Sequence, residues 1–298
     1  MHEKYGETAI PAMTIHEAYL TTHAAPSPLA PAMQRARGTV RLRFTADERG
    51  TSASEAFQSG SAKVRFPRVE AGEAFEATLI NTAGGITGGD DFRWTIAAEA
   101  GAQAAVTGQA AERIYKRSSG VARIETTLSV GDGSSLAWLP QETIVFDRSA
   151  MQRTLHADVH PNGRLLAAEA IVLGRTAMGE AARAVSIRDQ WRVTRGGRVI
   201  FADALRLEGD STATLTGGAT GNGARALATL IFVAKDAEAH LERARAALDE
   251  AGGEAGVSAW NGVLVARLIA ADGQTLRADL TGLIIALRQA NMPRVWNC

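Results

Sequence analysis

The chain has 298 residues, 46% of them hydrophobic, which is enough to bury a sizeable core in one large domain or two small ones. Lys and Arg number 32 and are balanced by 32 Asp and Glu. This balance argues against a nucleic-acid-binding protein, which must neutralise many phosphates. The single cysteine, Cys298, excludes a disulfide within one chain and a thiolate cluster for a metal. With no apolar stretch near the roughly 18–20 residues of a membrane span and no signal-like N-terminus, we expect a cytoplasmic protein without a membrane partner.

Residues 1–36 differ in composition from the rest of the chain. Their segment TTHAAPSPLAPAMQ combines several prolines with almost no branched aliphatic side chains. Such a segment buries too little apolar surface to offset the entropy that ordering would cost. We therefore predict a flexible N-terminal arm over residues 1–36 and a single β-rich domain over residues 37–298.

Between Gly38 and about Phe232, apolar and polar residues mostly alternate. In the segment GTVRLRF, for example, every second side chain is apolar, which is typical of a half-buried strand. About a dozen similar short runs follow, separated by turn signals such as GDG (131–133) and PNG (161–163). No helical pattern and no fixed repeat period interrupt them, so the pattern predicts an all-β body of sandwich-like or stacked sheets.

Two helical patterns occur late in the chain. The segment 236–253 has Leu241, Ala244 and Leu248 on one stripe and ends in glycines. A second helix is predicted from about Gly273 to Asn291, before Pro293, and a strand is predicted over 262–270. The fold class is therefore mainly β, a large multi-stranded sheet body with two helices near the C-terminus (β-rich α+β).

Signatures of common catalytic sites are absent from the sequence. It contains no G-x-x-x-x-G-K-[ST] phosphate loop, no G-x-G-x-x-G turn opening a helix, no G-x-S-x-G elbow and no H-E-x-x-H zinc helix. A hydrolase or lyase that uses paired carboxylates as acid and base is an alternative, but no arranged nucleophile or base supports it. We expect a protein that is not an enzyme.

One strand carries residues of metal-binding type. His156, Asp158 and His160 alternate along the strand and project from one face, and imidazoles with a carboxylate suit nickel or zinc. The residues between them are apolar and form the opposite face. This pattern favours a solvated polar face over a surface metal site.

A glycine-rich segment, NTAGGITGGDDF (81–92), precedes a predicted strand. Its four glycines permit positive φ angles and close backbone approach, and Asp90 follows them directly. The glycines are Gly84, Gly85, Gly88 and Gly89. The glycines alone favour a tight hairpin with ordinary turn residues over a binding loop.

Two carboxylates stand inside apolar strand runs. Alternation places Glu169 on the same face as Leu165 and Ile171, and Asp203 on the same face as Phe201. A carboxylate on a core-facing side must be paired, protonated or in contact with water, because burying it bare costs several kcal/mol. An ion pair with an arginine and a polar channel therefore both remain open.

Six segments in chain order form a family pattern: NTAGGITGGDDF (81–92), AAERIYKRSSG (110–120), LAWLPQETIVFD (136–147), LLAAEAIVLGRTAMGE (165–180), WRVTRGGRVIFADALRLEG (191–209) and MPRVWNC (292–298). Together they resemble the UreD family of urease accessory proteins, called UreH in some organisms. The resemblance covers most of the chain from about residue 38 onward and leaves the N-terminal arm outside.

The resemblance implies a scaffold rather than a catalyst, with a large β structure and two helices. It implies binding to the urease apoprotein and recruitment of the accessory protein UreF, which in turn binds the GTPase UreG. It further implies nickel delivery to urease through an internal water-filled tunnel, with transient Ni(II) and no tightly bound cofactor. Which surface meets UreF or urease is left open, as are the nickel affinity, the role of residues 1–36, and a homodimer or a dimer of complexes.

By the same resemblance, four acidic residues of this chain would carry the nickel conduit. They are Asp90 in the G-G-D turn, Glu169 before the L-G-R segment, Asp203 in the F-A-D-A-L-R-L strand and, more weakly, Glu112 in the A-E-R-I-Y segment. Glu169 stands where other members carry Asp. Spaced carboxylates hold Ni(II) less tightly than imidazole or thiolate clusters do, which suits transit. The alternative is a protein–protein bridge that nickel never enters, in which these carboxylates form structural ion pairs.

Overall fold

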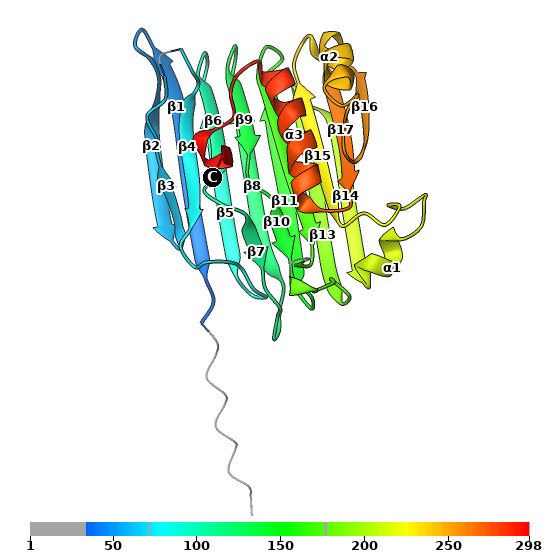
Figure 1. The fold of residues 1–298 in the computed structure, drawn as a ribbon. Helices are drawn as coiled ribbons and strands as arrows, with labels where there is room; N and C mark the ends of the chain where they lie inside the picture. Colours follow the sequence, from blue (N-terminus) through cyan, green and yellow to red (C-terminus); the bar gives the residue numbers. More distant parts are fainter. Residues whose placement is uncertain (1–33, 71, 176–177, 298) are drawn as a thin grey trace, which may run out of the picture. The chain divides into compact units, whose positions relative to one another are not determined.

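The computed structural model describes residues 34–70, 72–175 and 178–297 (Figure 1). The described residues from Arg35 onward form one structural unit, and its first strand, β1, begins at Arg37. The arm predicted over residues 1–36 lies outside the described residues as far as residue 33 and stays a prediction.

The described residues form two β-sheets. The first sheet has seven strands, in the order β14 (Arg198–Gly209), β13 (Val185–Arg195), β11 (Ala150–Val159), β8 (Ala122–Val130), β5 (Asp91–Ala98), β1 (Arg37–Asp47) and β2 (Gly50–Gly60). The second sheet has ten, in the order β16 (Glu254–Trp260), β17 (Val263–Ala270), β15 (Ala226–Val233), β12 (Arg164–Leu173), β9 (Ser135–Leu139), β6 (Gln103–Gly108), β4 (Phe75–Asn81) and β3 (Ala62–Arg65), with β10 (Thr143–Val145) and β7 (Glu112–Ile114) branching from β12.

From β4 to β13 the chain passes back and forth between the two sheets, and the successive strands within each sheet pair in parallel. This winding was not predicted. The strands β5, β8, β11 and β13 begin at residues 91, 122, 150 and 185, so the turns of the coil differ in length. Their unequal lengths explain why the sequence shows no fixed period.

Alternation of side chains creates the main core between the sheets. In β8 every second residue is buried, so Ile124 and Leu128 face the second sheet while the residues between them face outward. The same alternation occurs in β5 and β13. The predicted stacking of sheets is therefore confirmed. Apolar residues recur at every second position because successive side chains of a strand point to opposite faces of the sheet.

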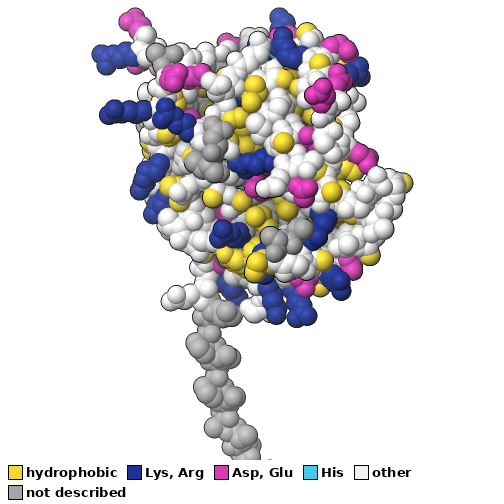
Figure 2. Space-filling view, viewed as in Figure 1, with side chains coloured by type: hydrophobic (Ala, Val, Ile, Leu, Met, Phe, Trp, Pro, Cys, Tyr) yellow, Lys and Arg dark blue, Asp and Glu magenta, His cyan; other side chains and the backbone are white. Residues whose placement is uncertain are grey.

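A second core lies on the outer face of the second sheet. Helix α3 (Gly273–Arg288) packs on β17 and β15 and buries Leu276, Leu280 and Leu283 against them. The helix begins at Asp272, whose carboxylate accepts hydrogen bonds from two first-turn amides. On this face, charges of both signs are interspersed with hydrophobic side chains (Figure 2).

Comparison with the sequence prediction shows both agreement and correction. The strand over 262–270 and the final helix are confirmed, as is the fold class. The helix predicted over 236–253 is wrong in length: a 3-10 turn, η2 (Ala237–His240), leads into the short α2 (Leu241–Ala246). None of the helices in the described ranges is long and apolar enough to cross a bilayer.

Five further elements of the described residues were not predicted, and β2 and the three-residue β7 are two of them. Strand β16 lies at a sheet edge, where its side chains are exposed or only half-buried. Helix α1 (Ser211–Leu215) is a single turn capped by the Asp210 carboxylate. A final 3-10 turn, η3 (Arg294–Asn297), lies in the segment where Pro293 was expected only to end the preceding helix.

Candidate functional site

The second sheet is split next to the middle of β12. Strand β9 pairs with β12 over Arg164–Ala167, and the short β10 pairs with it over Ile171–Leu173. The intervening residues of β12, with Glu169 at their centre, have no partner strand on that side. The loops that connect β6 to β7 and β9 to β10 run beside this split.

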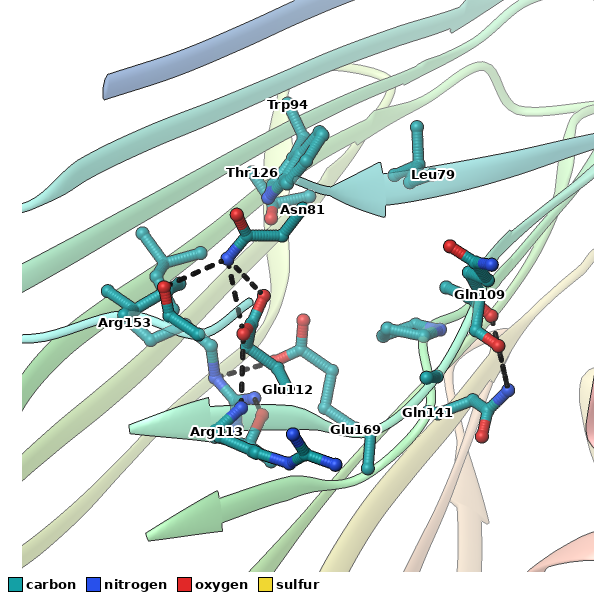
Figure 3. A pocket seen from close by; sticks show the side chains of 18 of the residues that line it. Leu79, Asn81, Trp94, Gln109, Glu112, Arg113, Thr126, Gln141, Arg153 and Glu169 are labelled. Carbon is teal, nitrogen blue, oxygen red and sulfur yellow. Dashed lines mark hydrogen bonds and ion pairs between the residues drawn. The ribbon is translucent and has the colours of Figure 1, made fainter. Parts of the chain in front are cut away.

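A cavity of about 210 Å³ lies at the split (Figure 3). The residues that line it come from both sheets and from the two loops, and its polar side chains include Asn81, Gln109, Glu112, Gln141, Arg153 and Glu169. Indole rings of Trp94 and Trp138 form part of its apolar wall. We call this space the first cavity.

Glu169 is the most deeply buried carboxylate of the first cavity, with 5% of its surface exposed. Its Oε1 accepts a hydrogen bond from Trp138 Nε1 at 3.0 Å. Its Oε2 lies 2.9 Å from Arg153 Nε but makes no hydrogen bond. Burial raises the pKa of Glu169 to about 7, although the nearby Arg153 charge opposes the rise.

Arg153 is buried, and it donates its hydrogen bonds to residues other than Glu169. Its Nε donates to Asp189 Oδ1 at 3.1 Å, its Nη2 donates to Asp189 Oδ2, and its Nη1 donates to Thr143 Oγ1 at 3.2 Å. Burial lowers the pKa of Arg153, but the Asp189 and Glu169 carboxylates outweigh this effect and raise the pKa above its ordinary value. Arg153 therefore stays charged. The sequence analysis missed Arg153 and Asp189. Strand alternation could have found them, because they share faces with the buried Leu155 and Ile187.

Glu112 faces the same cavity from β7, and Figure 3 shows its carboxylate beside the Asn81 amide. Asn81 Nδ2 donates to Oε1 and Oε2 of Glu112 at 3.3 and 3.1 Å. Burial raises the pKa of Glu112, and these hydrogen bonds only partly oppose it. The structure therefore brings together two of the predicted acidic residues, Glu112 and Glu169.

A second cavity, of about 90 Å³, adjoins the first and shares Arg153 and Glu169 with it. Asp203 of β14 lines this second cavity together with Arg267 of β17. Arg267 Nη1 lies 2.7 Å from Asp203 Oδ2, which joins the first sheet to the second. Three of the four predicted conduit residues thus lie along two adjoining cavities.

Asp90 lies elsewhere and is outside the lining of both cavities as the described residues define them. Its Oδ1 accepts from the Ala36 amide and its Oδ2 accepts from the Thr87 amide, each at 2.8 Å. Only 4% of Asp90 is exposed. These contacts indicate a carboxylate that shapes the glycine-rich turn.

The glycines of that turn allow close packing. Gly84 and Gly85 line the first cavity, and a Cβ on Gly85 would lie 2.2 Å from the Tyr115 ring. A Cβ on Gly88 would lie 2.3 Å from the Ser119 carbonyl oxygen, and Gly89 has a φ of 94°. The turn therefore forms a wall of the first cavity and packs tightly on the loop that follows β7.

The histidine pattern of β11 lies on the outer face of the first sheet. His156, Asp158 and His160 are exposed. Asp158 accepts from Thr194 Oγ1, and His160 Nδ1 lies 3.1 Å from Asp132 Oδ1. In the described ranges no group of three or more His, Cys, Asp or Glu side chains is placed to hold a metal ion.

Comparison with known proteins gives a consistent result. The family model described as UreD urease accessory protein matches residues 36–297. A protein named urease accessory protein UreD, from Azorhizobium caulinodans, is 46% identical over 267 residues, which cover 90% of this chain and 98% of that protein. Proteins of the same name from Agrobacterium fabrum and Xanthobacter autotrophicus are 46% and 45% identical, and each alignment covers about nine-tenths of both chains.

Proposed function

We propose, from the premise that this chain belongs to the UreD family of urease accessory proteins, that it is a non-catalytic scaffold of nickel delivery. Membership of the family gives the chain a role in urease maturation. Within that role, it binds the urease apoprotein and recruits UreF and, through UreF, the GTPase UreG, in the cytoplasm. The outer faces of the sheets and α3 offer it the surface for such partners.

The scaffold also passes Ni(II) through its interior, along the first and second cavities. Support comes from Glu112, Glu169 and Asp203, whose carboxylates line these adjoining spaces. The single observation that carries the proposal is Glu169 Oε2, a buried oxygen without a hydrogen bond on a residue that lines both cavities. Oxygen ligands bind Ni(II) weakly enough for release, which a path requires. For Asp90 a place on the path stays a prediction, because both its oxygens accept from backbone amides.

Isosteric variants of the cavity carboxylates test the conduit. Glu112→Gln, Glu169→Gln and Asp203→Asn remove the charge and keep the shape of each side chain. Co-expression with urease and its other accessory proteins, followed by metal analysis of the purified urease, is expected to show lowered nickel with intact assembly. Glu125→Gln, on the exposed outer face of β8, is the matched control. Full nickel loading with all three variants would exclude the conduit.

A pure protein–protein bridge is the second candidate, and the ion pairs favour it. Glu169 lies against Arg153 and Asp203 against Arg267, as in a structural role. Under this hypothesis, the loss of urease nickel would follow the loss of stability in each variant. Thermal melting separates the two functions: a lowered midpoint with a proportional loss of activation supports the bridge, and an unchanged midpoint with lowered nickel supports the conduit.

A further inference from the structure

A cluster of three charges lines the two cavities. Arg153 and Glu169 line both cavities, and Asp189 lines the second beside them. An ion that moved from one space to the other would therefore pass the Arg153 guanidinium. Arg153 is 4% exposed and Glu169 is 5% exposed, so bulk water does little to screen these charges.

The guanidinium is held by residues other than Glu169. Its fork binds both oxygens of Asp189, and its third nitrogen binds Thr143. Toward Glu169 it offers charge without a hydrogen bond, which leaves Oε2 without a donor. A cation that contacted Oε2 would thus break no hydrogen bond of Arg153.

Arg153 also binds the carboxylate of Asp189. With its fork in place, Asp189 has each oxygen bound to a guanidinium nitrogen. Without it, Glu169 and Asp189 would be two buried carboxylates near one another with no cation between them. Such a pair would hold a divalent cation more tightly than a single carboxylate oxygen does.

We propose that Arg153 is a positioning residue that limits the passing divalent cation to a single, weakly binding oxygen of Glu169, so that the junction releases the ion instead of storing it. The inference rests on the proposed conduit. The guanidinium acts in two ways: it keeps Asp189 from binding the ion, and its charge repels the ion at short range.

The test compares charge removal with charge conservation at this position. Full-length Arg153→Gln, Arg153→Lys and wild-type chains are co-expressed with urease and its other accessory proteins in nickel medium. Nickel retained on the accessory chain and nickel in urease are then measured by mass spectrometry. Arg153→Gln should retain on the order of tenfold more nickel than wild type and deliver less. Arg153→Lys, which keeps the charge but not the fork, should retain less nickel than Arg153→Gln.

Two controls test whether the retained nickel is bound at the Arg153 cluster. Arg245→Gln removes an arginine from an exposed pair with Glu242 and should change neither quantity. Adding Glu169→Gln to Arg153→Gln should remove the retained nickel, because one of the two carboxylates is lost. If Arg153→Gln retains no more nickel than Arg245→Gln, the inference is wrong.

Asp189→Asn provides an independent test should Arg153→Gln fail to fold. The amide no longer holds the charged fork, so Arg153 turns its hydrogen bonds to Glu169 Oε2 and blocks it. Urease nickel should then fall to the level given by Glu169→Gln, and wild-type delivery by Asp189→Asn overturns the inference. Full delivery by Glu112→Gln, Glu169→Gln and Asp203→Asn alike would instead remove the conduit itself, so the two failures are distinguishable.

Discussion

Gln141 and Val295 lie 154 residues apart in the sequence, yet the Gln141 side-chain amide donates to the Val295 carbonyl at 2.9 Å. Gln141 lines the first cavity, so the C-terminal residues support its wall. Arg277 of α3 donates to the Trp296 carbonyl at 2.8 Å, and Trp296 Nε1 donates to Thr107 Oγ1 at 3.0 Å. The C-terminal segment therefore fixes the loop between β9 and β10.

We expect Trp296→Phe to lower the free energy of unfolding by about 1–2 kcal/mol, because the buried Thr107 hydroxyl loses its indole donor. Trp296→Ala should cost about 3–5 kcal/mol, since it also leaves a cavity. Urea denaturation measures both. Trp260→Phe, at an exposed position, is the control and should stay within about 0.5 kcal/mol of wild type. Equal losses at both tryptophans would contradict this account of the C-terminal segment.

A pair of alanine substitutions tests the glycine-rich turn. Gly84 has a φ of 75° with open space around its Cα, whereas Gly85 has a φ of 149° and lies against the Tyr115 ring. Gly84→Ala should therefore cost only the backbone strain, about 1–2 kcal/mol. Gly85→Ala should cost distinctly more, because the ring must also move. Thermal melting of the two variants compares them directly, and equal midpoints would show that the ring contact is unimportant.

The pKa of Glu169 gives the stability of the chain a defined pH dependence. Burial raises this pKa from its ordinary 4.5 to about 7, so between these values the folded chain keeps a proton that the unfolded chain has lost. The contribution of Glu169 is thus most favourable below about pH 4.5 and declines by a few kcal/mol as the pH rises towards about 7.

Glu169→Gln should remove this dependence. Its stability relative to wild type is expected to increase between about pH 5 and about pH 7.5, as measured by urea denaturation at each pH. Glu125→Gln, at the exposed position used above, should leave the pH profile unchanged. If the stability of Glu169→Gln changes with pH in the same way as that of wild type, the pH dependence comes from a group other than Glu169.

The two ion pairs that line the cavities should differ greatly in their effect on stability. Arg153 and Glu169 are buried, so Arg153→Ala leaves two carboxylates without a counter-charge and should cost about 3–5 kcal/mol. Arg267 is about half exposed, and Arg267→Ala should cost about 1 kcal/mol or less. Chemical denaturation measures both losses. Similar values would mean that water reaches the inner pair as freely as the outer one.

Alternation along single strands predicted the orientation of the site residues well. It placed Glu169 on the core-facing side of its strand, where the structure has it at the split in the second sheet. The alternative of an arginine partner, which the sequence left open, is what the structure shows for Glu169 and Asp203. Which arginine pairs with which carboxylate depends on strand order, and that is not encoded in any one strand.

The cavities themselves could not be predicted from residue patterns. They depend on β7, which is too short to show a period, and on where β10 pairs, which no single strand encodes. Asp90 illustrates the opposite case. The resemblance to the family suggested a conduit role for it in the G-G-D turn, but its oxygens accept hydrogen bonds from the amides of Ala36 and Thr87.

The short links beside the split in the second sheet restrict where the chain can tolerate insertions and deletions. The links at 109–111 and 140–142 each run from one strand to the next along the split, and both contribute to the wall of the first cavity. One residue more or fewer there would shift the short β7 or β10 by one side chain against its neighbouring strand and turn inward groups outward. The hairpin tips at 48–49 and 196–197 join neighbouring strands of one sheet far from the cavity lining. Natural insertions and deletions should therefore accumulate at the tips and be rare in the links.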